Sequence, residues 1–147
     1  MRFMMIMFPK EYENAKPGWA PDLKSMEAMG KYNEELGKAG VLLALDGLTP
    51  PATMSARVTF KSGKSKVTDG PFTEAKELIA GFWIWKVKSL EEAIEWVKRC
   101  PNPHNVDSEI EIRQVFEMED FAPVLSQEEI DHKVQVRSQL PNQTAHK

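Results

Sequence analysis

The amino-acid sequence predicts an α+β fold, and three observations lead to this prediction. Short apolar segments alternate with two segments of helical periodicity, in the order strand, helix, strand, strand, helix, strand. A lysine-rich segment with a central Ser-Gly turn lies in the middle and has the alternation of a β-hairpin. Each helical segment follows a residue suited to cap its first turn, Asp22 in one case and Ser89 in the other.

The first third of the chain contains two expected strands and one helix. Residues 2–8 have apolar side chains on both faces of an extended segment. Asp22 is the expected N-cap of a helix that is ended by Gly37 and Gly40, because glycine commonly follows the last helical turn. Residues 41–45 form a second strand, again apolar on both faces.

The middle of the chain contains the expected hairpin, residues 57–68, and a third apolar strand, residues 79–87. The turn of the hairpin is Ser62-Gly63. Alternation along the two hairpin strands predicts a covered side with Val58, Phe60 and Val67. It predicts a solvent side with Lys61, Lys64 and Lys66.

The second helix begins with a capping box, in which Ser89 caps the amide of Glu92 and Glu92 returns the bond. Cys100-Pro101 ends this helix, and residues 109–116 alternate as the last strand. Residues 1–121 therefore form the expected domain. Residues 122–147 form a polar tail that is partly helical or disordered. Ser126-Gln127-Glu128-Glu129 fits the cap of a short helix there, and disorder is expected from about Gln139.

This element order predicts the split βαβ, or ferredoxin-like, arrangement with an inserted hairpin. Right-handed crossovers place both helices on one face of the sheet. The other face is then bare, although three strands are apolar on both sides. An apolar surface of that size implies a partner, so we expect a homodimer in which two sheets pack face to face.

Composition restricts the class of protein. The chain has 147 residues, 41% of them hydrophobic and 28% charged, which is ordinary for one soluble globular domain. A net charge of −3 argues against nucleic acid as a partner. No segment has the roughly 20 apolar residues of a membrane span, and the single cysteine fits a reducing compartment, so we expect a cytoplasmic protein. The three histidines have no metal-ligand spacing and no phosphate-binding loop is present, so we expect neither a metal nor another cofactor.

Two aspartates are the candidate catalytic residues. Asp46 ends an apolar strand and precedes a glycine, so we expect partial burial, which raises a carboxyl pKa toward the range of general acid–base catalysis. Asp69 begins Asp69-Gly70-Pro71, where it could be held rigidly at the mouth of a cavity. Both positions also fit plain turns, in which an Asp side chain bonds the backbone.

Three further residues are candidate ligand-binding groups. Phe72 could form an apolar wall, Lys76 could hold an anion, and Arg113 could bind a carboxylate or an enolate oxygen. The alternatives are a core aromatic for Phe72, a solvated charged face for Lys76, and a surface salt-bridge ladder for Arg113 with Glu109 and Glu111.

The segment Val67-Thr68-Asp69-Gly70-Pro71-Phe72-Thr73-Glu74, with residues 77–82 behind it, resembles the DGPF signature of the YCII-related domain family. The similarity continues through residues 92–96, 99–101 and 109–113 and spans residues 1–121. It implies a ferredoxin-like dimeric α/β barrel. Most members are uncharacterised bacterial proteins.

The resemblance implies less about the reaction. A few relatives in the wider superfamily act without a metal on small chlorinated or lactone-type ring-cleavage products, and some use a helical histidine paired with an aspartate. Residues 22–40 contain no histidine, so that pair is not carried over. The DGPF branch often has a glutamate before the glycine of its second strand, where this chain has Asp46.

Three functions therefore stay open. The first is a cofactor-independent enzyme acting on a small organic acid or lactone-like molecule in a cleft of the dimer. In it Asp46 would be the general acid or base, Asp69 would orient it or share its proton, and Arg113 or Lys76 would hold the anion. The second is a non-catalytic small-ligand-binding protein with the same cavity, and the third is a protein-interaction module.

Overall fold

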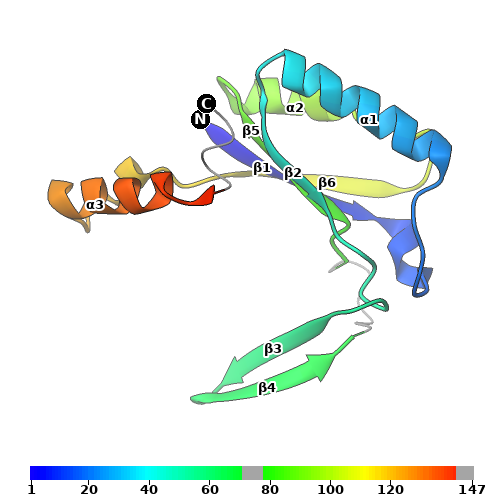
Figure 1. Ribbon diagram of the computed structural model, residues 1–147, viewed down its shortest axis with the longest axis horizontal. Helices are drawn as coiled ribbons and strands as arrows, with labels where there is room; N and C mark the ends of the chain where they lie inside the picture. Colours follow the sequence, from blue (N-terminus) through cyan, green and yellow to red (C-terminus); the bar gives the residue numbers. More distant parts are fainter. Residues whose placement is uncertain (71–77, 142–147) are drawn as a thin grey trace.

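The computed structural model describes residues 1–70 and 78–141, and this part of the chain combines helices with antiparallel sheets (Figure 1). The predicted α+β class is confirmed. The elements are β1 (Arg2–Pro9), η1 (Lys10–Asn14), α1 (Leu23–Lys38), β2 (Leu42–Gly47), β3 (Ala56–Lys61), β4 (Lys64–Asp69), β5 (Gly81–Lys86), α2 (Leu90–Lys98), β6 (Ser108–Gln114), η3 (Met118–Phe121) and α3 (Gln127–Ser138).

Four strands form one sheet in the order β2-β5-β1-β6, and every neighbouring pair is antiparallel. Strand β5 lies between β1 and β2, while β1 lies between β5 and β6, so the two βαβ units interleave. Helices α1 and α2 cover one face of this sheet (Figure 1). The hairpin β3–β4 lies on the other side, and α3 lies beyond the end of the sheet.

The core lies between the sheet and the two helices. Alternate residues of β1 and β5 point into it, and Phe3, Met5, Trp83 and Trp85 are all at most 6% exposed. The hydroxyl of Tyr32, on α1, donates a hydrogen bond to a carbonyl oxygen of α2 over 2.7 Å. Burial raises the pKa of this phenol. The core thus fixes both helices on one face.

The opposite face, which we call the open face, has an apolar centre and charged edges. Because side chains alternate along a strand, the residues between the core residues of β1 and β5 point away from the helices. The half-buried apolar residues of this face are Met4, Ile6, Phe8, Phe82 and Ile84. The residues paired with them on the outer strands are Ala44 and Asp46 on β2, and Glu109, Glu111 and Arg113 on β6. No helix of the described chain covers this face (Figure 1).

The predicted caps form, with one change. Asp22 accepts a hydrogen bond from the amide of Ser25 at 2.8 Å, and Ser89 accepts one from the amide of Glu92 at 3.2 Å. The carboxylate of Glu92, however, accepts from the amide of Lys88 at 2.7 Å, one residue before the predicted donor. The amides of Ser89 and Lys88 both lie near the start of α2. The Glu92 side chain is long enough to reach the amide of Lys88, which is farther from the helix.

The hairpin has the predicted strands but not the predicted cover. Val58 pairs with Val67 on one of its faces, as expected. These side chains are nonetheless 50% and 62% exposed, and Phe60 is 80% exposed. The expected covered side is therefore exposed in residues 1–70 and 78–141, where β3 and β4 pair only with each other. Alternation specifies which residues share a face, but it does not supply a surface to cover that face.

Candidate functional site

Asp46 lies on β2 at one edge of the open face. It pairs with Phe82 on β5, and the next residue of β5 toward the hairpin is Gly81, whose Cα lies close to the carbonyl of Asp46. A Cβ added to Gly81 would come within 2.8 Å of that carbonyl oxygen, so only glycine fits there. The Asp46 side chain is exposed in the single chain, in contrast to the partial burial expected from the sequence.

Arg113 lies on the same face but at the opposite edge. Strand β1 lies between Arg113 and β5: its Met4 pairs with Arg113 on β6 and with Ile84 on β5. The strands of Asp46 and Arg113 are thus three spacings apart, roughly 14 Å. Asp46 is also level with Glu111, two residues along β6 from Arg113. The guanidinium is 68% exposed and lies 3.5 Å from Glu111, the surface pairing named as its alternative. The two residues do not meet within one chain.

The other predicted site residues belong to the DGPF segment. Asp69 ends β4, where it pairs with Ala56, and its side chain lies outside what the structure describes. Phe72 and Lys76 lie in residues 71–77, which are also outside the described residues. Gly70 is described: a Cβ there would meet the Ser55 hydroxyl and come within 2.5 Å of the carbonyl oxygen of Pro51. This explains why the segment needs glycine at that position.

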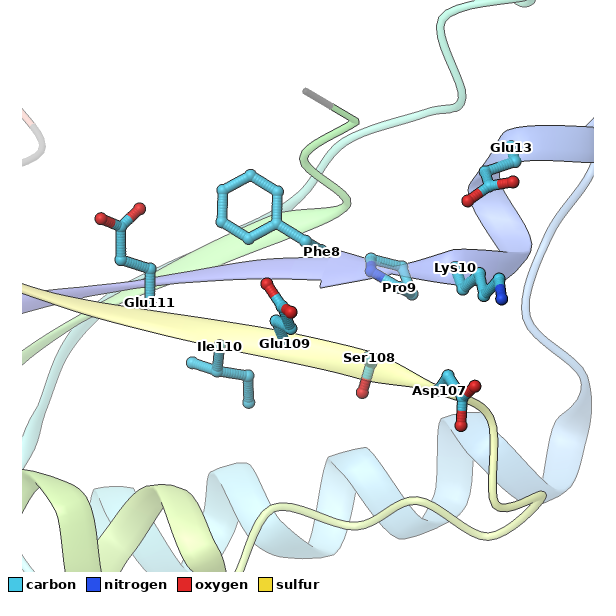
Figure 2. Close-up of a pocket in the computed structure, with 9 residues that line it drawn as sticks. All are labelled: Phe8, Pro9, Lys10, Glu13, Asp107, Ser108, Glu109, Ile110 and Glu111. Carbon is cyan, nitrogen blue, oxygen red and sulfur yellow. The ribbon is translucent and has the colours of Figure 1, made fainter. Parts of the chain in front are cut away.

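An open groove of about 1130 Å³ runs along the ends of β1 and β6 (Figure 2). Phe8, Glu109 and Glu111 project into it from the open face, whereas Ile110 points toward the helices (Figure 2). Its charged residues are Lys10, Glu13, Asp107, Glu109 and Glu111. Four of these five are acidic, so we call it the acidic groove.

A second, smaller cavity of about 410 Å³ lies on the helix side of the sheet, and we call it the helix-side pocket. It opens between the start of α1, the loop after α2 and η1. Its apolar lining includes Met7, Tyr12, Trp19, Met29, Val97 and Ile110. Its polar lining includes Glu11, Ser25, Asn102 and His104.

Two aromatic residues shape the wall of this pocket. The rings of Tyr12 and Trp19 meet edge to face, with centroids 5.0 Å apart. The Tyr12 hydroxyl donates to the carbonyl of Leu48 at 2.6 Å, which holds η1 against the end of β2. Burial raises the pKa of Tyr12, so the phenol stays a neutral donor. The wall is therefore anchored to the sheet.

A histidine and an aspartate meet beside the mouth of the pocket. Nε2 of His104 lies 2.7 Å from Oδ2 of Asp22, and both side chains are about half exposed, at 44% and 55%. Hydrogen bonds from Ser25, with a smaller contribution from His104, hold the pKa of Asp22 below its ordinary value. The carboxylate is thus ionised and oriented before any ligand arrives.

Sequence reasoning missed this pair, because it considered the three histidines, His104 among them, only as metal ligands. The two residues are 82 positions apart, and Asp22 carried only the signal of a helix cap. The usable signal was the loop of residues 101–106, which has two prolines and follows α2. In the structure the carbonyl of Pro103 in this loop accepts a hydrogen bond from Lys24 in the first turn of α1.

Cys100 lines the same pocket from the end of α2. Burial raises the pKa of its thiol to about 11, so it is protonated at neutral pH and is not a nucleophile. Among the described residues, no group of three or more His, Cys, Asp or Glu side chains is placed to hold a metal ion. No helix within residues 1–70 or 78–141 is long and apolar enough to cross a bilayer.

Comparison with known sequences agrees with this architecture. The sequence profile of the YCII-related domain matches residues 1–119, most of the chain and all six strands. The chain belongs to the YCII-related domain family. An uncharacterized protein of Rhizobium meliloti (strain 1021) is 27% identical to this YCII-related protein over 106 residues, which are 69% of this chain and 82% of the relative. The residues matched by the family profile include β1 to β6 and the helices α1 and α2, which line the helix-side pocket. Helix α3 lies outside them.

Proposed function

We propose that this YCII-related protein binds a small organic molecule with an apolar body in the helix-side pocket. The observation that supports this best is the pocket itself, since its volume of about 410 Å³ lies within the roughly 300–1,000 Å³ usual for ligand sites. Its lining of aromatic, thioether and aliphatic groups, with a few polar groups at the mouth, also follows the usual pattern.

The charge around the mouth selects among ligands. Glu11 lines the pocket, and Asp22 lies on the His104 side of the mouth. Two carboxylates repel an anion and attract a cation or a hydrogen-bond donor. The expected ligand is therefore neutral or cationic, with an aromatic or aliphatic body.

His104 gives this site an acid–base group. The Asp22 carboxylate favours one orientation of the His104 ring by accepting from Nε2. The other ring nitrogen is then available to exchange a proton with a ligand at the mouth. Such chemistry needs no cofactor.

Calorimetric titration with three probes of similar size tests the site: benzylamine, phenol and benzoate. We expect benzylamine and phenol to bind more tightly than benzoate. Met29→Trp, which fills the pocket, should abolish binding, whereas Leu23→Trp, on the same helix but 73% exposed, should leave it intact. Asp22→Asn keeps the helix cap and should reduce the preference for the cation. Equal binding by the two Trp variants would exclude this pocket.

The open face supports a second candidate, a cleft between two copies of the chain. Its apolar centre is only half buried in the single chain, and its two candidate groups, Asp46 and Arg113, lie at opposite edges. A two-fold axis parallel to the strands would place the β2 edge of one copy over the β6 edge of the other. Packed sheets lie about 10 Å apart, so Asp46 would then face the partner copy's β6 edge across the width of a small ligand.

In this cleft the catalytic proposal for Asp46 and Asp69 applies to a small organic acid or lactone-like molecule. Arg113 or Lys76 would hold its anion, with Phe72 as a wall. Benzoate distinguishes the two sites. Binding of benzoate that is lost in Arg113→Ala and retained in Met29→Trp would support the open-face cleft. Binding of benzylamine that is lost in Met29→Trp and retained in Arg113→Ala would support the helix-side pocket. Asp46→Asn then separates an enzyme from a ligand-binding protein. It should abolish turnover in an enzyme, and it should only alter affinity in a ligand-binding protein.

A further inference from the structure

We propose that the β3–β4 hairpin is an arm that grips a second copy of the same chain. Its apolar face would cover Phe8 of the partner copy, and its tip lysines would lie against the acidic groove. The inference rests on the face-to-face homodimer of the second candidate above and adds to it a specific contact.

The hairpin needs a cover that the described part of its own chain does not supply. All six residues of β3 are exposed, and among the described strands β3 and β4 pair only with each other. A two-stranded hairpin is at best marginally stable in water without a third strand or a packed face. Phe60 is 80% exposed and shares a face with the Val58–Val67 pair, so an apolar surface is ready for a partner.

The charges of the arm and the groove are complementary. Lys61 and Lys64 pair with each other directly beside the turn, on the face opposite Phe60. Because they stand at the end of the hairpin, their long flexible side chains can reach past the turn toward carboxylates beyond the tip. Within residues 1–70 and 78–141, neither lysine forms an ion pair. The acidic groove presents Glu109 and Glu111 beside Phe8 on the open face (Figure 2). A basic tip with an apolar face therefore matches an acidic groove with an apolar centre.

The topology places the arm of one copy over the groove of the other. The hairpin is inserted between β2 and β5, at the end of the sheet where Gly47 pairs with Gly81. The groove is at that same end, where Phe8 pairs with Glu109, but on the β1–β6 half. A two-fold axis parallel to the strands exchanges the two halves and keeps the end. The arm of each copy then meets the groove of its partner.

The arm is also long enough. Six residues in a strand span roughly 20 Å, whereas packed sheets are separated by about 10 Å. In Figure 1 the hairpin stands on the open-face side of the sheet, opposite α1 and α2. A copy seated on the open face would therefore lie within reach of the hairpin.

Charge reversal on each side of the contact gives a sharp test. One variant carries Lys61→Glu and Lys64→Glu, and a second carries Glu109→Lys and Glu111→Lys. Each alone should raise the dimer dissociation constant by roughly tenfold or more, measured by sedimentation, because like charges then face each other in both contacts. Mixing the two variants should restore wild-type affinity, since every arm in the mixed dimer meets a groove of opposite charge.

The control is a pair of equal charge changes on the helix side, Lys31→Glu with Lys88→Glu, which should leave the dissociation constant within about twofold. Circular dichroism confirms that each variant is folded. A monomeric wild type, or reversed variants that dimerise normally, or a mixture without recovery would each overturn the proposal. Phe60→Ser gives an independent check, because it weakens the dimer without changing its charge.

These outcomes separate the arm from the ligand sites. If the charge variants lose the dimer but still bind benzylamine, the helix-side pocket stands. If the wild type dimerises and neither reversal nor Phe60→Ser has an effect, the face-to-face dimer stands without the arm.

Discussion

Asp22 contacts one partner within its own helix and one that is far away in the sequence. Its Oδ1 caps α1 through the amide of Ser25, and its Oδ2 binds His104. One carboxylate thus starts a helix and orients a histidine at the mouth of a pocket. By contrast, Asp46 has the expected place at a strand end but is exposed in the single chain. The chemical role of each of these carboxylates therefore depends on the groups that contact it.

Cys100 should react slowly with alkylating agents in the folded protein. Burial raises the pKa of its thiol to about 11, so the thiolate is scarce near neutral pH. An unfolded thiol has a pKa near 8.5, which at about pH 8 predicts alkylation roughly two orders of magnitude slower in the native state. Mass spectrometry after timed iodoacetamide treatment, with and without urea, measures both rates. Equal rates would contradict the burial of this side chain.

The ion pair between Arg2 and Glu117 should make stability depend on pH. Two hydrogen bonds of 2.9 Å join the groups, and this bonding lowers the pKa of Glu117 from its ordinary 4.5. A lowered pKa stabilises the fold above the ordinary value, and this contribution is lost as the pH falls through the lowered pKa. Glu117→Gln should therefore cost up to about 1 kcal/mol at neutral pH, a modest value because the pair is partly exposed.

Urea denaturation at neutral pH and at about pH 3 compares wild type with Glu117→Gln. The difference in unfolding free energy should shrink on acidification. A difference that stays constant across this range would mean that the ionised carboxylate is not the stabilising species.

At the scale of elements, the caps and turns hold the helices and the hairpin in place. Ser126 and Glu129 form a reciprocal capping box at the start of α3. At the base of the hairpin, which we call the neck, Gly70 packs against Ser55 and Pro51. The amide of Gly70 donates to the carbonyl of Ser55, and the Ser55 hydroxyl donates to the carbonyl of Pro51 at 2.6 Å. The glycine of the DGPF segment is therefore part of a packed neck.

Gly70→Ala should destabilise the protein by about 1–3 kcal/mol, because its Cβ would overlap the Ser55 hydroxyl and the Pro51 carbonyl. The matched control is Gly37→Ala, within α1, where an added Cβ meets nothing within 4 Å. That change should be neutral or stabilising by up to about 1 kcal/mol. Urea denaturation of both variants measures the difference, and equal stabilities would contradict the close neck.

At the scale of the whole molecule, one face of the sheet is covered by helices and the other is open. The sheet is apolar on both faces, so the single chain leaves Met4, Ile6 and Phe82 only half buried. The hairpin adds a second uncovered apolar surface on the same side. One partner seated on the open face would cover both.

Ile6→Glu should therefore convert a homodimer to a monomer. Ile6 pairs with Phe82 near the centre of the open face, where a carboxylate would lose its hydration in a packed interface. We expect the dissociation constant to rise by roughly a hundredfold or more. The control, Leu23→Glu, adds the same charge on the helix side at a residue that is 73% exposed. Sedimentation equilibrium reports both, and a wild-type monomer at micromolar concentration would exclude the dimer.

The sequence by itself determined the elements of this protein. Caps at Asp22 and Ser89, the Ser62-Gly63 turn and the alternation of apolar residues are local signals, since each depends on neighbours within a few positions. They predicted the α+β class and the face on which each strand residue lies. The Glu92 bond was misplaced by one residue because two amides compete at a helix start.

Only the tertiary structure decided which distant residues meet and which faces stay uncovered. It brought His104 to Asp22, and it separated Asp46 from Arg113 by the width of the sheet. It also left Phe60 in solvent, where alternation predicted a covered side. The physical reason is that such contacts depend on loop paths and strand order, which are set by packing of the whole core. No local pattern of side chains records them.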